Sequence, residues 1–183
     1  ETASTARLFL ELVACSENKP GNSRADQLVR LLVGKEDFND ALARASTVIP
    51  SSRQLDFMPV FRDFCILNNR FAENPGAIGA VEWQNLESRF LNLQKKWPSD
   101  ISVASLLSHM ASLRNDYLAA LTQTERGIRL AGDLQFENSN PIVINFKKQQ
   151  IRFSQLLGAE SQKIDQFQDA LKYYESAVRL IHD

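Results

Sequence analysis

The chain has 183 residues, of which 44% are hydrophobic and 23% are charged, with only 7 glycines and 6 prolines. These proportions are typical of one ordinary folded domain, and they exclude a disordered, collagen-like or disulfide-rich chain. Because 21 Lys and Arg residues stand against 22 Asp and Glu residues, the net charge is −1. No surplus of positive charge is available to bind phosphates, so nucleic acid is not expected as the partner.

Apolar residues recur at spacings of three and four along most of the chain, as in amphipathic helices. Two such runs are Leu86, Phe90, Leu93 and Trp97, and Leu171, Tyr174, Val178 and Ile181. No stretch alternates apolar and polar residues for long enough to predict a strand. The pattern predicts about nine helices, at 3–16, 23–33, 37–48, 55–72, 77–97, 101–113, 116–131, 141–160 and 164–182.

Proline-containing steps separate these predicted helices: Pro20-Gly21, Ile49-Pro50, Asn74-Pro75-Gly76, Trp97-Pro98 and Asn140-Pro141. In the last step, Asn140 is expected to cap the N-terminus of a helix whose first turn contains Pro141. Gly76-Ala77-Ile78-Gly79 could form a phosphate-binding turn, but we favour a simple helix start there, because two glycines alone are weak evidence.

Four segments share one pattern, in which an aromatic or small residue is followed by two spacers, an Ala and an aliphatic residue. They are Phe38-Asn39-Asp40-Ala41-Leu42, Ala77-Ile78-Gly79-Ala80-Val81, Tyr117-Leu118-Ala119-Ala120-Leu121 and Phe167-Gln168-Asp169-Ala170-Leu171. The central alanines lie 39, 40 and 50 residues apart. Each segment opens the second helix of a predicted hairpin, where a small Ala lets two antiparallel helices approach closely and the aromatic residue is expected to fill a neighbouring groove.

The last 33 residues carry the most specific form of this pattern. Counted from Ile151, the first helix contains Leu157-Gly158, and the second contains Phe167, Ala170, Tyr174 and Ala177. With these residues the chain resembles the tetratricopeptide repeat family. The stretch from Ile101 resembles the same family through Leu107, Tyr117, Ala120 and Gly127, with Ser108 at the Gly position and Thr124 at the aromatic position.

Two further stretches match this family less closely. From Asn22 the matching residues are Leu28, Phe38 and Ala41, and from Phe61 they are Leu67, Phe71 and Ala80. Because the spacings exceed about 34 residues, some helices or loops should be longer than in a regular repeat, and an ordered loop is expected at 132–140.

The resemblance implies an all-α fold, in which antiparallel helix hairpins form a right-handed superhelical stack, an α-solenoid. A single repeat domain is expected over 1–183, with hairpins at 23–48, 55–97, 101–131 and 141–182 and a leading helix at 3–16. The chain begins at Glu1 without Met and ends directly after the apolar Leu180-Ile181. We therefore expect it to be a piece of a longer protein.

Catalytic and cofactor motifs are missing from the sequence. It contains no phosphate-binding glycine loop, no H-E-x-x-H, no C-x-x-C and no G-x-S-x-G. Neither His109 nor His182 has a carboxylate or thiol at metal-ligand spacing. The sequence therefore predicts a protein that is not an enzyme and that uses no metal and no cofactor.

The two cysteines and the lack of a long apolar run bear on location. Cys15 and Cys65 lie in apolar stretches, which predicts buried thiols without a disulfide and favours the cytoplasm. Leu12-Val13-Ala14-Cys15 also looks like a lipoprotein cleavage site, so a lipoprotein or periplasmic location stays an alternative. No membrane span is expected, because no apolar run approaches about 18 residues.

The resemblance to the repeat family implies a concave groove that binds a peptide, a helix or another protein through four positions on each first helix. Those positions are Ser23, Asp26, Arg30 and Val33; Arg62, Cys65, Asn69 and Ala72; Ser102, Ser105, His109 and Ser112; and Arg152, Gln155, Ala159 and Gln162. The candidate contacts among them are Arg30, Arg62, Asn69, His109, Arg152 and Gln155. A guanidinium can bind a carboxylate or a carbonyl through several donors, although each residue could equally be an ordinary solvated side chain.

The sequence therefore favours a protein-interaction scaffold or adaptor without catalysis. Reversing the charge of Arg62 and Arg152 is expected to abolish partner capture and to leave the helical content unchanged. Two alternatives stay open. The chain could be the regulatory or sensor domain of a larger enzyme or transcription factor, or a self-assembly module that forms a homo-oligomer through its C-terminal helix at Leu180-Ile181.

Overall fold

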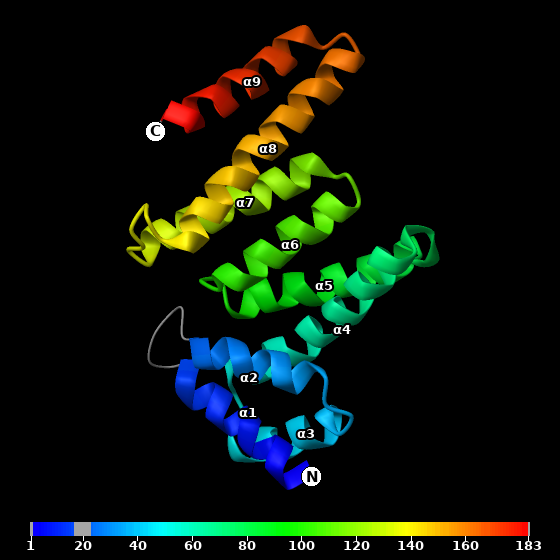
Figure 1. The fold of residues 1–183 in the computed structure, drawn as a ribbon, viewed down its shortest axis with the longest axis vertical. Coiled ribbons are helices and arrows are strands. Elements are labelled where there is room, and N and C mark those ends of the chain that lie inside the picture. The colour runs from blue at the N-terminus through cyan, green and yellow to red at the C-terminus, as the bar shows by residue number, and fades with distance from the viewer. Residues whose placement is uncertain (1, 17–22, 183) are drawn as a thin grey trace. The chain divides into compact units, whose positions relative to one another are not determined.

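The computed structural model describes residues 2–16 and 23–182, and within these ranges it is all-helical, with nine α-helices, one short 3-10 helix and no strand (Figure 1). The predicted break at Pro20-Gly21 lies outside the described residues. The elements are α1 (Thr2–Ser16), α2 (Ser23–Val33), α3 (Phe38–Val48), α4 (Arg53–Glu73), η1 (Pro75–Ala77), α5 (Ala80–Lys96), α6 (Ile101–Leu113), α7 (Tyr117–Asp133), α8 (Pro141–Lys163) and α9 (Phe167–His182).

The start of α5 differs from the sequence prediction, which placed it at residue 77; the end of α8 and the start of α9 also come three residues later than predicted. The helix begins at Ala80 because Gly79 caps it, and the carboxylate of Glu82 accepts the N–H of Gly79 at 3.1 Å. Pro75–Ala77 forms the separate turn η1 before this cap. The Gly79 amide of the candidate phosphate-binding turn is thus bound by the protein's own carboxylate.

Helices α6, α7 and α8 all end in the same way. The second residue after each helix has a positive φ: 61° at Asn115, 57° at Gln135 and 59° at Asp165. The next residue's N–H then reaches back to a carbonyl in the last turn of the helix, in the bonds Asp116 to Ala111, Phe136 to Ala131 and Gln166 to Ser161, each 2.9 Å long. This is the Schellman ending, formed here without glycine.

The chain divides into two compact units, Glu1–Arg89 and Phe90–Asp183, and the boundary falls inside α5. In the first unit, α1 packs against both α2 and α3. The rings of Phe9 on α1 and Phe38 on α3 meet edge to face at 5.2 Å, and both are fully buried together with Ala41. Helix α1, which the sequence analysis placed outside the four predicted hairpins, is therefore central to the core of this unit.

Helix α4 lies antiparallel to the first part of α5 within the same unit. Arg70 pairs with Glu82 at 2.6 Å, and Asp63 pairs with Arg89. Asp63 and Arg70 are seven residues apart on α4. Their partners are also seven residues apart on α5 but follow in the opposite order, as expected for antiparallel helices. Directly after Arg70 and Glu82 in the sequence, the rings of Phe71 and Trp83 meet edge to face at 5.8 Å.

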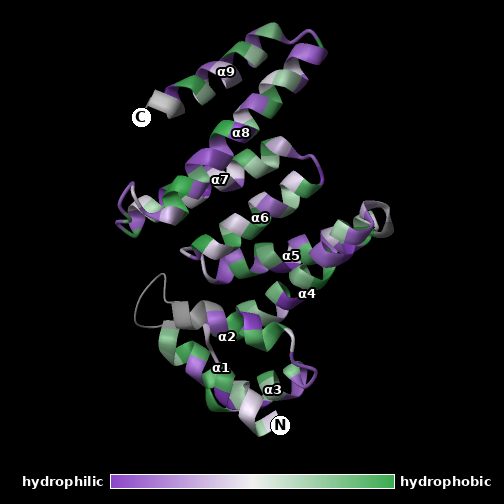
Figure 2. Cartoon of the chain, in the orientation of Figure 1, coloured by the Kyte–Doolittle hydropathy of each residue, from purple (hydrophilic) through white to green (hydrophobic). Residues whose placement is uncertain are grey.

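In the second unit, α6 packs on α7, α7 on α8 and α8 on α9, with loops at alternating ends (Figure 1). The loops after α6 and α8 are mostly hydrophilic, whereas the helices mix both kinds of residue (Figure 2). Ala120 and Ala170 are buried at the starts of α7 and α9, as predicted for the places where hairpin helices meet. In contrast, Ala80 is exposed. The expectation that Phe167 fills a groove is wrong, because its side chain is 61% exposed.

Both cysteines belong to the first unit, and they form no disulfide. Cys15 and Cys65 are free thiols as predicted, but they are half-buried and so less buried than the sequence suggested. Partial burial raises the pKa of the Cys65 thiol and makes it less reactive as a nucleophile.

Candidate functional site

The six candidate contacts are divided between the two units. Arg30, Arg62 and Asn69 belong to the first unit, and His109, Arg152 and Gln155 belong to the second. The two sets are therefore described separately. The side chains of the groove positions Ser23 and Asp26 lie outside the described part of the chain. The side chains of Leu180 and Ile181, expected at a self-assembly contact, also lie outside it.

In the first unit, Arg62 on α4 contacts its own protein. Its guanidinium carbon lies 4.6 Å from the centre of the Phe38 ring, and its Nη2 donates to the carbonyl of Lys35 at 3.3 Å. Arg62 thus joins α4 to the turn between α2 and α3. Reversing its charge is therefore expected to disturb this unit, and not only to remove a contact with a partner.

Arg30 and Asn69 are exposed on α2 and α4. Among the described residues neither side chain forms a hydrogen bond or an ion pair. The structure provides no contact that links these two residues with Arg62 into one site.

In the second unit, the charge of Arg152 on α8 acts on the imidazole of His109 on α6. Burial is the main cause that lowers the pKa of His109, and the positive charge of Arg152 lowers it further. Both helices contribute, together with α7, to one apolar cluster: α6 contributes Ala111, and α8 contributes Phe153 and Leu157. Ala111 lies two positions after His109 and Phe153 lies one position after Arg152, so both side chains start beside this cluster.

Around this pair the surface is polar and has few opposing charges. Gln155 is exposed one turn after Arg152 on α8, and α6 carries no ionisable residue besides His109. In the described part of the chain, no carboxylate forms an ion pair with Arg152. We call His109, Arg152 and Gln155 the α6–α8 surface. It offers guanidinium, amide and imidazole donors to an incoming acceptor such as a carboxylate or a peptide carbonyl.

Below this surface lies a polar contact that the sequence analysis missed. Ser108 Oγ and Thr124 Oγ1 lie 2.8 Å apart, and each hydroxyl also lies within hydrogen-bond distance of the carbonyl of Ala120. Both side chains are fully buried. The sequence showed Ser108 and Thr124 only as two departures from the repeat pattern, whereas in the structure they contact each other.

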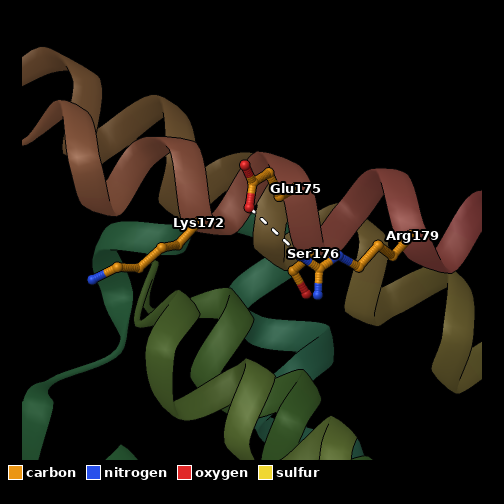
Figure 3. A pocket seen from close by; sticks show the side chains of 4 residues that line it. All are labelled: Lys172, Glu175, Ser176 and Arg179. Carbon is orange, nitrogen blue, oxygen red and sulfur yellow. Dashed lines mark ion pairs between the residues drawn. The ribbon is translucent and has the colours of Figure 1, made fainter.

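A second surface feature, also missed, lies on α9. Lys172, Glu175, Ser176 and Arg179 line a shallow depression, and all four come from this one helix (Figure 3). The carboxylate of Glu175 lies 3.7 Å from the guanidinium of Arg179. A depression lined by one helix is too open to enclose a small molecule.

Two kinds of site are not found among the described residues. No cluster of three or more His, Cys, Asp or Glu side chains is arranged to bind a metal ion. No described helix combines the length and the apolar character that a membrane span requires.

Comparison with family models, with curated proteins and with solved structures gives no match to this chain. The function is therefore inferred from the residues and their geometry.

Proposed function

We propose that the chain is a tetratricopeptide-repeat-like interaction module without catalytic activity, and that its second unit binds a peptide segment of a partner protein at the α6–α8 surface. The observation that carries this proposal is the electrostatic interaction between His109 and Arg152. They come from different helices, and both belong to the groove positions that the family resemblance implies.

The arrangement of the second unit supports this assignment. Helices α6 and α8 are the first helices of the two hairpins, and α7 packs on both of them. In a stack of hairpins, first helices line one continuous surface on which an extended segment can lie. A peptide that crosses from α6 to α8 would meet His109 and then Arg152.

The chemistry of the surface favours a peptide with an acidic group. Arg152 can donate two parallel hydrogen bonds to a carboxylate, and no protein carboxylate competes for it in the described residues. His109 is mainly neutral near pH 7 because its pKa lies below 6.5. A neighbouring carboxylate would favour the protonated imidazole and so gain a second charged donor.

In the first unit, fewer residues are proposed as partner contacts than the sequence suggested. Arg62 is used to stabilise its own unit and is left out of the proposed site. Arg30 and Asn69 stay predicted contacts for a partner that extends over the first unit.

The proposal is tested by selecting binders from a displayed library of random peptides and measuring their affinity by calorimetry. We expect enrichment of peptides with Asp, Glu or a free C-terminal carboxylate. The variant Arg152→Glu should bind them at least about tenfold more weakly, because it replaces attraction by repulsion. The control Arg129→Glu carries the same charge change on an exposed position of α7. Equal affinity for both variants, or failure to select any peptide, would contradict the proposal.

A further inference from the structure

Helix α9 presents an apolar stripe to solvent. Phe167, Leu171 and Val178 are 61%, 58% and 53% exposed, and their spacing of four and seven residues places them on one face of the helix. Ile164, directly before the helix, is 65% exposed. We call Phe167, Leu171 and Val178 the α9 stripe. Side chains of this size rarely gather in the open without a partner.

The equivalent positions on α7, 50 residues earlier, show what covers such a stripe. Tyr117 stacks on Phe153 of α8 with ring centres 6.4 Å apart. Leu121 is 8% exposed and packs in one cluster with Phe153 and Leu157. On α7 these positions are therefore covered by an antiparallel helix. The α9 stripe has the form of a surface that a helix covers.

The charges beside the stripe indicate which helix fits. Along the exposed side of α9 the signs alternate: Asp169 is negative, Lys172 positive, Glu175 negative and Arg179 positive. In a second copy of α9 that runs antiparallel, with both helices centred near residue 174, each of these charges faces a charge of opposite sign. Two antiparallel copies of α9 would place Lys172 of each opposite Glu175 of the other, and Arg179 opposite Asp169. A parallel pair would place like charges together.

We propose that α9 is a self-association surface, at which a second copy of this chain docks its own α9 in antiparallel orientation, stripe against stripe. Such a contact uses the same patch on both copies and is closed by a two-fold axis. Within each copy Lys172 pairs with Asp169 at 3.0 Å and Glu175 with Arg179 at 3.7 Å. These pairs are exposed and weak, so they can exchange for contacts between copies.

The exposed area of the stripe is that of a small interface. The stripe and Ile164 together expose roughly 400 Å² of side chain per copy, about half of what one partner buries in an interface of standard size. The surface therefore fits a small, reversible dimer with a dissociation constant on the order of micromolar. This proposal does not depend on peptide binding at the α6–α8 surface.

Sedimentation equilibrium of the full chain over a range of concentrations tests self-association. The wild type should show a reversible monomer–dimer equilibrium. Leu171→Glu should weaken the dimer at least about tenfold, because it places a charge in the centre of the apolar contact. The matched control is Leu118→Glu, since Leu118 on α7 is 57% exposed and lies outside the stripe. Helical circular dichroism checks that both variants fold. A wild type that stays monomeric at every concentration overturns the proposal.

A charge exchange separates antiparallel pairing from general hydrophobic association. Lys172→Glu alone and Glu175→Lys alone should each weaken the dimer several-fold, because each places like charges opposite each other. The double variant, with both substitutions in one chain, restores opposite charges and should recover most of the wild-type affinity. A double variant as weak as the single variants overturns the antiparallel arrangement.

Discussion

The hydroxyl groups of Ser108 on α6 and Thr124 on α7 lie 2.8 Å apart in a fully buried helix interface. Fifty residues later, the same two positions are occupied by Gly158 and Tyr174. A Cβ added at Gly158 would lie 2.8 Å from the Tyr174 ring, so these two residues are also in direct contact. One hairpin therefore fills this site with a hydrogen-bonded pair, and the other fills it with a ring over a glycine.

We expect the polar pair to contribute as a unit. Ser108→Ala should lower the free energy of unfolding by about 1–2 kcal/mol, because it leaves the Thr124 hydroxyl buried with one partner fewer. Thr124→Val should have a similar or smaller effect, since the Ser108 hydroxyl retains its hydrogen bond to the Ala120 carbonyl. The double variant should lose about 1 kcal/mol less than the sum of both. Denaturant unfolding of the four proteins measures this coupling, and strictly additive losses would show that the hydroxyls act independently.

Two glycines on α7 provide a matched pair for testing close packing. A Cβ at Gly127 would overlap the ring of Phe146, which is only 1% exposed, whereas a Cβ at Gly132 would meet nothing within 4 Å. We expect Gly127→Ala to lower the free energy of unfolding by about 2 kcal/mol through overpacking. Gly132→Ala should raise it by up to about 1 kcal/mol through helix propensity. Equal effects of the two substitutions would contradict the close contact of α7 with α8.

The contacts of Arg62 lead to a prediction for the first unit. Arg62→Glu removes the cation from the Phe38 ring and the hydrogen bond to the Lys35 carbonyl. We expect a loss of about 1–2 kcal/mol in the free energy of unfolding. Arg30→Glu, the same charge change at an exposed position, should stay within about 0.5 kcal/mol. Thermal unfolding compares the two, and unchanged stability of the Arg62 variant would return this residue to the list of candidate partner contacts.

The helices could be predicted from the sequence because apolar spacing and proline steps are local signals. Both ends of α6 agree with the prediction. The later start of α5 follows from the carboxylate of Glu82 three residues after Gly79, a capping pattern that was visible in the sequence but was not used. The Schellman endings at Asn115, Gln135 and Asp165 could not be placed, because none of these residues is glycine.

Which helices meet, and which side chains share a site, could not be predicted from spacing alone. The central place of α1 in the first unit depends on contacts between distant segments. The repeat register identified both His109 and Arg152, but only the packed structure shows that the charge of one acts on the other. The same register selected Arg62, which contacts Phe38. The position of a residue in the repeat predicts the helix face on which its side chain lies, whereas its contacts depend on how the neighbouring helices pack.

The proximity of His109 and Arg152 can be measured in the free protein. Arg152→Ala removes a nearby positive charge, so we expect the pKa of His109 to rise toward its usual value of 6.5 without reaching it, because burial remains. Titration followed by NMR of the imidazole signals measures this. Arg129→Ala serves as the control. An unchanged His109 pKa in the Arg152 variant would contradict the proximity of the two side chains.

His109 also makes stability depend on pH. Its folded-state pKa lies below 6.5, so the folded protein favours the neutral imidazole, and protonation favours unfolding. The free energy of unfolding should therefore fall as the pH is lowered from 7 through 6.5 and toward the lower pKa of the folded state. His109→Asn should remove this part of the decrease. Urea unfolding at pH 7.5 and pH 5.5 compares the two proteins, and an identical decrease in both would contradict the prediction.

The central claim is that an acidic peptide segment binds at the α6–α8 surface through His109 and Arg152. The most direct measurement is the pKa of His109 by NMR, with and without a saturating peptide selected for binding. A carboxylate seated between the two side chains should raise this pKa and should also make binding tighter as the pH falls below 7. A His109 pKa that is unchanged by a tightly bound peptide would show that the peptide binds elsewhere and would contradict the assignment of the α6–α8 surface.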